Sequence, residues 1–288
     1  MSHEHIPARH RTLLACLLAA SATFGCSGGT SDASDPNACR DLDNGIPLCG
    51  PSSVEIPLEP GSSSPVILAH IDGREARVLI DTGAQDPIVS STWLGVTDAQ
   101  WVRTHELCFG DLCLRGEQVY AQDTQFSQPD VAGINGFIGM RTLRHFIVEF
   151  DHENGVRFTE GASACAGTSH PITFGAEGTP FADISVDGHD FPGVTIDSGS
   201  TYTLLSQASL AELDAYVTGG SQVADLCTVN GCMTGVAHTS TVNEYCVFGS
   251  CQESVPVKFP AFDAVGSSWL FLRDTAFDFP QSSIVFCE

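Results

Sequence analysis

Two short stretches of the chain repeat one another, and this repetition constrains the fold more than any other feature. Residues 78–84 read Val-Leu-Ile-Asp-Thr-Gly-Ala, and residues 194–200 read Val-Thr-Ile-Asp-Ser-Gly-Ser. Each is an apolar run, typical of a strand, that ends in an aspartate, a small hydroxyl residue and a glycine. One such motif is an ordinary turn signal. Two copies with matching flanks indicate a repeated structural unit.

The flanks before each aspartate also match. Residues 66–73 form an apolar run that ends in Asp-Gly, and residues 181–188 have the same design. An Asp-Gly pair between two strand-like runs predicts a hairpin turn. The interval from this glycine to the aspartate is one residue longer in the second copy, which predicts a β-bulge in one of the two hairpins.

The match continues beyond the motifs. Residues 88–90 match residues 204–206, and Gly139 with its following residues matches residues 268–273. This alignment places Ser268 opposite Gly139. The chain is therefore interpreted as an internal duplication.

The doubled motif resembles that of bilobal aspartic proteases of the pepsin type, and each copy is close in size to a retroviral-type protease subunit. Residues 80–84 resemble the retroviral form of the motif, and residues 196–200 the pepsin form. Phe137-Ile138-Gly139 is similar to the apolar-apolar-glycine that follows the catalytic loop in such lobes. The resemblance covers residues 63 to 286, and it rests on both motifs together.

The resemblance implies a mostly β fold with two similar β-barrel-like lobes and a cleft between them. Short strand-like runs separated by close turn signals point to the same class. We expect the N-terminal lobe at residues 63–162 and the C-terminal lobe at 163–288. The boundary falls in a segment rich in glycine, alanine and serine.

The expected chemistry is hydrolysis of peptide bonds by a water activated between Asp81 and Asp197. Two carboxyl groups held close together share a proton, so one can act as a base on water while the other donates to the carbonyl oxygen. Glycines allow the sharp turn beside each carboxylate, and the hydroxyl residues can tie the two loops together. The supporting residues are Thr82, Gly83, Ser198, Gly199 and Ser200. The sequence suggests no metal and no cofactor.

Three features depart from the family pattern. Ala84 lacks the hydroxyl that Ser200 has, so the two carboxylates are expected to be supported unequally. Ser268 stands where a glycine is usual. The first copy has no clear tyrosine-bearing flap; Tyr120 is a candidate, although its neighbours favour a strand. The longer second copy suggests an extra hairpin around residues 227–235, which is either a cover over the cleft or a surface hairpin without a role there. The alternative function is therefore a catalytically silent, peptide-binding surface lipoprotein on the same fold.

The N-terminus predicts export. Residues 1–25 have a basic start and an apolar core too short to span a bilayer, as in a signal peptide. Cleavage after Ala22 would give a secreted protein, whereas a lipobox-like segment ending at Cys26 would give a lipoprotein of a bacterial cell envelope. Lipidation of Cys26 leaves an even number of cysteines, which favours the second. Residues 26–62 are predicted to be a tether.

Cysteine spacing predicts five disulfides. Three pairs are separated by four residues rich in glycine and small or polar types, as in a hairpin turn, and this spacing does not fit the usual zinc pairs. Two cysteines of the tether close a small loop, and the remaining two lie at the lobe junction and at the end of the last strand. The pairs are Cys39–Cys49, Cys108–Cys113, Cys165–Cys287, Cys227–Cys232 and Cys246–Cys251.

The charge limits the partners. The 288 residues include 35 Asp and Glu against 12 Lys and Arg, a net charge of −23. Such a surface disfavours nucleic acid and anionic lipid. We expect a monomer that meets a peptide or protein substrate and contacts the membrane through its lipid anchor only.

Overall fold

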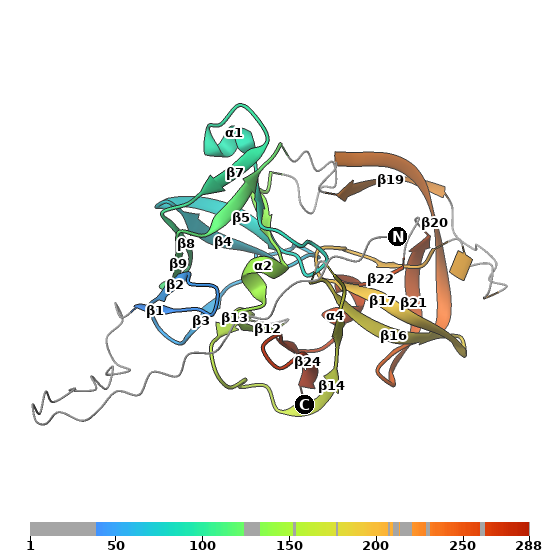
Figure 1. Ribbon diagram of the computed structural model, residues 1–288. Helices are drawn as coiled ribbons and strands as arrows, with labels where there is room; N and C mark the ends of the chain where they lie inside the picture. Colours follow the sequence, from blue (N-terminus) through green and yellow to red (C-terminus); the bar gives the residue numbers. More distant parts are fainter. Residues whose placement is uncertain are drawn as a thin grey trace, which may run out of the picture. The chain divides into compact units, whose positions relative to one another are not determined.

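The protein is mostly β, as predicted (Figure 1). The computed structural model describes residues 39–123, 133–151, 154–176, 178–206, 208–209, 213, 221–228, 231–259 and 263–287, with the backbone alone at 221–228, 231–239 and 259. These residues form three sheets, with short helices at α1 (Ser91–Leu94), α2 (Met140–Leu143) and α4 (Ser267–Leu270). Within these ranges no helix is long and apolar enough to cross a membrane.

The first sheet has ten strands in the order β1-β2-β9-β8-β4-β5-β11-β6-β10-β7. Its strands follow the two-residue period of the sequence: in β4, Leu68 and His70 are exposed while Ala69 and Ile71 are buried. The bounds are β1 (Cys39–Asp41), β2 (Pro47–Cys49), β4 (Val66–Ile71), β5 (Arg74–Ile80), β6 (Ile88–Val89), β7 (Gln100–Arg103), β8 (Glu106–Phe109), β9 (Leu112–Arg115), β10 (Gln118–Ala121) and β11 (Gly136–Ile138).

The second large sheet has eight strands in the order β15-β16-β17-β22-β18-β21-β20-β19. All of them come from the second copy of the repeat. The bounds are β15 (Thr173–Phe174), β16 (Pro180–Val186), β17 (His189–Asp197), β18 (Thr203–Leu204), β19 (Ser221–Thr228), β20 (Gly231–Val247), β21 (Ser250–Phe259) and β22 (Ala264–Gly266).

These two sheets share one strand arrangement. In the first, β5 pairs in parallel with β11, which pairs antiparallel with β6, and β6 pairs in parallel with β10. In the second, β17, β22, β18 and β21 repeat these pairings in the same order and sense. The repeat in the sequence is therefore a repeat of topology.

The predicted Asp-Gly turns are present in both sheets. Asp72 and Asp187 adopt left-handed backbone angles, with φ of 53° and 47°. The carboxylate of Asp72 accepts from the Glu106 N–H at 3.0 Å, and that of Asp187 from the Glu244 N–H at 2.8 Å. The predicted bulge is also confirmed, because the register between β16 and β17 shifts after Ala182.

A third, six-stranded sheet combines the last strands of both copies in the order β14-β24-β23-β12-β13-β3. β12 of the first copy pairs with β23 of the second, so the sheet joins the two halves of the chain. The bounds are β3 (Ser53–Ile56), β12 (Ile147–Asp151), β13 (Gly155–Thr159), β14 (Gly167–Pro171), β23 (Thr275–Asp278) and β24 (Ser283–Cys287).

Part of the segment predicted to be a tether, before residue 63, belongs to the folded sheets. β2 pairs with β9, and β3 pairs with β13, so residues 39–56 belong to the folded sheets. Leu48 and Ile56 are 0% and 7% exposed. The predicted lobe start at residue 63 is therefore too late. The sequence did not predict these strands, because each is only three or four residues long and the segment around them is rich in polar residues. Residues 1–38, including the predicted signal peptide and Cys26, lie outside the described residues.

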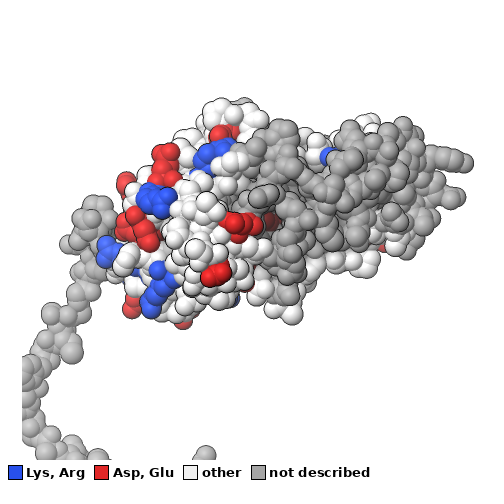
Figure 2. Space-filling model, turned by 90° about the horizontal axis from the view of Figure 1, so that it is seen from above, with Lys and Arg blue, Asp and Glu red and all other residues white. Residues whose placement is uncertain are grey.

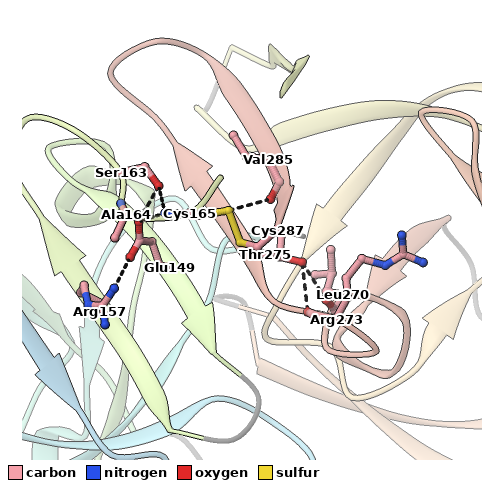
Figure 3. The surroundings of a disulfide bond; sticks show 10 residues. All are labelled: Glu149, Arg157, Ser163, Ala164, Cys165, Leu270, Arg273, Thr275, Val285 and Cys287. Carbon is pink, nitrogen blue, oxygen red and sulfur yellow. Dashed lines mark hydrogen bonds and ion pairs between the residues drawn. A yellow bond between two sulfur atoms is a disulfide. The ribbon is translucent and has the colours of Figure 1, made fainter. Parts of the chain in front are cut away.

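The structure contains four of the five predicted disulfides: Cys39–Cys49, Cys108–Cys113, Cys165–Cys287 and Cys246–Cys251. Figure 3 shows Cys165–Cys287 beside Glu149, whose carboxylate accepts from the Ala164 N–H at 2.7 Å. The fifth pair is placed by backbone only: Cys227 lies opposite Cys232 in the β19–β20 hairpin, and their side chains are outside the described set.

Surface arginines are engaged with the excess of carboxylates. Arg77 pairs with Glu59 at 2.5 Å, Arg157 with Glu55 at 2.6 Å, and Arg141 with Asp86 at 2.8 Å. Figure 2 shows acidic and basic side chains next to one another on one face. Exposed pairs of this kind contribute little to stability, so the hydrophobic core carries most of the folding free energy.

Candidate active site

The two repeated aspartates stand at equivalent places in the two large sheets. Asp81 directly follows β5, and Asp197 is the last residue of β17. Each lies at the carboxyl end of a strand whose parallel neighbour is β11 or β22. Outside the carboxyl ends of parallel strands, side chains are free to face a ligand rather than the next strand.

The loops bring the two carboxyl groups together. A Cβ placed on Gly83 would lie 2.5 Å from Cγ of Asp197, and a Cβ on Gly199 would meet the Asp81 carboxyl equally closely. Each carboxyl group thus occupies the space beside the other loop's glycine. The two carboxyl groups are within hydrogen-bonding reach of each other. Both glycines are required because any side chain would push the carboxyl groups apart.

Backbone N–H groups hold each carboxylate from its own loop. Oδ1 of Asp81 accepts from Gly83 N at 2.9 Å and from Ala84 N at 3.0 Å. Oδ1 of Asp197 accepts from Gly199 N at 3.0 Å and from Ser200 N at 3.1 Å. The two sets match within 0.1 Å, so the carboxyl groups are oriented alike despite the different residues at positions 84 and 200.

The side chains of Thr82 and Ser198 lock the loops together. The Thr82 hydroxyl accepts from Ser198 N at 2.9 Å and donates to Ile196 O at 2.7 Å. The Ser198 hydroxyl accepts from Thr82 N at 3.1 Å and donates to Ile80 O at 2.7 Å. Both residues are 0% exposed. Each hydroxyl therefore satisfies two buried backbone groups of the opposite loop, which fixes the separation of the aspartates.

The surroundings of the pair favour protonation. Burial raises the pKa of Asp81 well above 3.8, and the neighbouring Asp197 raises it further by its charge and by a hydrogen bond. Burial also raises the pKa of Asp197, while the hydrogen bond with Asp81 and the backbone N–H groups oppose the rise. Two carboxyl groups in such contact hold one proton between them. The pair therefore offers a base and an acid at one point.

A glycine behind each loop completes the arrangement, and in the second copy it is Gly266. Ile196 pairs with Val265, and Asp197 with Gly266, in the β17–β22 ladder. In the first copy Ile80 pairs with Ile138, the residue before Gly139. The first N–H group of the helix that follows each glycine bonds to the equivalent loop carbonyl, which supports matching Gly266 with Gly139. Met140 N donates to Ala84 O at 2.8 Å, and Ser267 N donates to Ser200 O at 2.7 Å.

The prediction that Ser268 replaces Gly139 was therefore wrong by two residues. A Cβ on Gly139 would lie 2.7 Å from Ala84 O, and one on Gly266 would collide with Tyr202 O. Ser268 instead uses its hydroxyl to accept from Thr203 N at 3.1 Å. The correct signal was present in the sequence, since Ala264-Val265-Gly266 is also apolar-apolar-glycine.

The residues at positions 84 and 200 do not produce the predicted inequality. The Ser200 hydroxyl donates to Tyr202 O at 2.7 Å, and so its single proton is directed away from the Asp197 carboxylate. Ala84 packs into a small apolar cluster with Val66, Leu79, Ile88, Ile134 and Phe137. In the first copy the loop residue Ala84 therefore packs against apolar side chains, whereas in the second copy Ser200 makes a hydrogen bond.

Tyr120 is a strand residue, as its neighbours indicated. It lies in β10 opposite Trp101, with the ring centroids 5.3 Å apart, and packs against the cluster around Ala84. Neighbouring residues 124–132 lie outside the described residues. The extra hairpin of the second copy is formed by β19 and β20, for which the side chains before Ser240 are not described.

Two clusters contain metal-ligand types among the described side chains. They are Glu106 with Cys108 and Cys113, and Glu244 with Cys246 and Cys251. In both, the two sulfurs are bonded to each other in a disulfide, so neither can ligate as a thiolate. Their equivalent positions, with Cys108 opposite His70 and Cys246 opposite Ser185, mark them as matching scaffold hairpins.

The predicted residues of the two loops lie together in the structure. They are Asp81, Thr82, Gly83, Asp197, Ser198 and Gly199, with Ser200 beside them. The remaining predicted position, Cys26, lies outside the described part of the chain. Compared with known families and with curated proteins, the sequence matches no family model and no curated protein.

Proposed function

We propose that the protein is an aspartic endopeptidase that hydrolyses peptide bonds with a water activated between Asp81 and Asp197. The observation that carries the proposal is the convergence of two carboxyl groups from two matched loops onto one point. Two similar β-barrel-like lobes, the first ending near residue 162 and the second at about residues 163–288, would place this point in the cleft between them. The repeated strand order supports that architecture.

The chemistry follows from one proton shared by two carboxyl groups. The ionised carboxylate takes a proton from the water as its oxygen attacks the peptide carbonyl carbon, and the protonated carboxyl donates to the carbonyl oxygen. The resulting tetrahedral diol then collapses: the C–N bond breaks, one carboxyl group gives its proton to the leaving nitrogen, and the other carboxylate takes the proton of a diol hydroxyl, whose oxygen becomes the carbonyl oxygen of the new acid. The pair then holds one proton again. The raised pKa values keep the shared proton bound at a higher pH than isolated aspartates would.

The second candidate is a catalytically silent, peptide-binding surface lipoprotein with the same fold. Such a protein would need the cleft but not two apposed carboxyl groups, which repel each other when both are ionised. The full set of loop contacts, including both hydroxyl residues and four N–H donors to the carboxylates, favours the enzyme.

Purified mature protein incubated with a peptide library from pH 3 to pH 8 tests the function. We expect cleavage, strongest where the pair carries a single proton, and its suppression by a transition-state-mimicking aspartic protease inhibitor. A binder would retain peptides and the inhibitor without producing fragments. Absence of cleavage over the whole pH range, with the folded state verified by thermal unfolding, would contradict the enzyme.

We also propose that the protein is exported and anchored in a bacterial cell envelope through a lipid on Cys26, with ordinary cleavage and secretion as the alternative. Four disulfides are consistent with an oxidising compartment. Replacing Cys26 by alanine is expected to move the protein from the membrane fraction to the soluble fraction, since the thiol is the acylation site. Fractionation of the expressing cells measures this. An unchanged membrane fraction would refute lipidation at Cys26. The mass of the mature N-terminus distinguishes a lipidated Cys26 from ordinary cleavage after Ala22.

A further inference from the structure

Glu117 is a buried carboxyl group that the proposed chemistry does not use. It lies between β9 and β10, and it is 0% exposed. Neither carboxylate oxygen has a hydrogen-bond partner among the described residues. Its backbone is well held, because Glu117 O accepts from Thr104 N at 2.9 Å and from the Thr104 hydroxyl at 3.0 Å. The backbone therefore fixes where the side chain lies. Among the described residues the carboxylate has no hydrogen bond of normal geometry, although the Gln118 N–H lies near enough to lower its pKa.

Charged groups from three elements face Glu117. Arg141 lies in α2, Arg144 caps the same helix, and Asp86 belongs to the loop that follows the Asp81 motif. A fourth group, Arg103 of β7, lies against the adjacent Gly116, with Nη2 2.8 Å from the place of a Cβ. Neither Arg141 nor Arg144 donates a hydrogen bond to the Glu117 carboxylate.

Arg141 is already engaged elsewhere. Its Nε lies 2.8 Å from Oδ1 of Asp86, and its guanidinium lies over the Trp101 ring, 4.6 Å from the centroid. The Asp86 backbone in turn presses on Gly139, where a Cβ would meet Asp86 O at 2.7 Å. An ionised Glu117 would thus compete with Asp86 for Arg141 at a contact that supports the Asp81 loop.

We propose that Glu117 is a buried proton-binding site whose ionisation destabilises the fold beside the Asp81 loop as the pH rises. The cost arises because an ionised carboxylate without hydrogen bonds is strongly disfavoured away from water. A protonated carboxyl carries no such charge. The proposal concerns the folded state and does not depend on the protein being a protease.

The direction of the pH dependence follows from linkage. Burial raises the pKa of Glu117 from 4.5 to about 7. Arg141, the Gln118 N–H and Arg144 partly oppose the rise, and Asp86 adds to it. Between these two pH values the native state keeps a proton that the unfolded chain has released, so stability falls as the pH rises. Above the folded-state pKa, Glu117 is ionised in both the native and the unfolded state, and the loss of stability no longer grows.

The test compares the melting temperature of the full mature chain with that of Glu117→Gln from pH 4.5 to pH 8.5. Glutamine has the shape of the protonated acid and cannot ionise. We expect equal melting temperatures near pH 4.5 and an advantage for Glu117→Gln that grows to roughly 5–10 °C at pH 8. An advantage that does not change with pH, or a less stable variant at pH 8, would overturn the proposal.

Glu149→Gln is the matched control. Glu149 is 6% exposed, but its carboxylate accepts from Arg157 at 3.0 Å and from the N–H groups of Ala164 and Cys165 (Figure 3). Its replacement removes an ion pair, so we expect a lower melting temperature at neutral pH, the opposite sign.

A direct titration keeps the proposal falsifiable if Glu117→Gln does not fold. In wild-type protein labelled with ¹³C at the glutamate side-chain carboxyl, one resonance should titrate with a midpoint near 7. If every glutamate titrates below pH 5.5, the proposal is wrong. These readouts need no substrate, so their failure is distinct from a failure to observe cleavage.

Discussion

Replacing Asp81 or Asp197 by asparagine is expected to lower kcat/KM for peptide cleavage by roughly 10³-fold or more, because an amide can neither accept a proton from water nor donate one to the carbonyl oxygen. The loop geometry should survive. Asparagine Oδ1 can still accept from Gly199 N and Ser200 N at position 197, and from Gly83 N and Ala84 N at position 81.

Thermal unfolding separates lost chemistry from lost structure in these variants. Burial raises the pKa of both carboxyl groups above 3.8, so the native state keeps protons that the unfolded chain releases and stability falls as the pH rises above this value. Removing one carboxyl group removes part of that loss. We therefore expect each variant to melt at pH 7 at the wild-type temperature or above.

Asp123→Asn is a suitable control for the aspartate variants. Asp123 is exposed, and one carboxylate oxygen accepts from the Ser91 hydroxyl and from the hydroxyl and N–H of Thr92. Asparagine Oδ1 can accept the same bonds, so cleavage should be unchanged. Near-wild-type cleavage by Asp81→Asn or Asp197→Asn would contradict a shared-proton mechanism.

Replacing Thr82 by valine is expected to lower the free energy of unfolding by about 2–5 kcal/mol. Valine keeps the branched shape but leaves Ser198 N without its acceptor and Ile196 O without its donor, in a fully buried site. Each unpaired buried group costs about 1–3 kcal/mol. Denaturant unfolding at constant m-value measures the loss.

Thr82→Ser is the control, because it keeps the hydroxyl and removes one methyl group, at a cost of about 1 kcal/mol. Ser198→Ala should resemble Thr82→Val, since it orphans Thr82 N and Ile80 O. Each hydroxyl bonds the other loop's backbone, so the losses in the double variant should add incompletely. A loss below about 0.5 kcal/mol for Thr82→Val would show that the hydroxyl lock does not hold the loops.

Features set by residues close together in the chain were predictable. The Asp-Gly turns at Asp72 and Asp187, the bulge near Ala182 and the hairpin disulfide Cys108–Cys113 all depend on the chemistry of a few adjacent residues. Short-range sterics and turn preferences decide such features before the rest of the chain is placed. The repeat of topology was visible for the same reason, because each copy carries its own set of local signals.

Two features set by contacts between distant segments were missed. The choice of Gly266 over Ser268 is a matter of register between β17 and β22, and a register is fixed by packing across the ladder. The strands β2 and β3 have little apolar alternation in their sequences. They form strands because they pair with β9 and β13.

The sequence alone thus identified the paired aspartates and the residues beside them, because the doubled motif encodes each loop locally. Only the tertiary structure decided that the carboxyl groups touch each other's glycines and that the Ser200 hydroxyl is directed to Tyr202 O. It also decided that the Glu117 carboxyl group is buried without a hydrogen bond of normal geometry among the described residues. The physical reason is that burial and apposition are properties of segments brought together by folding, and residue order does not state them.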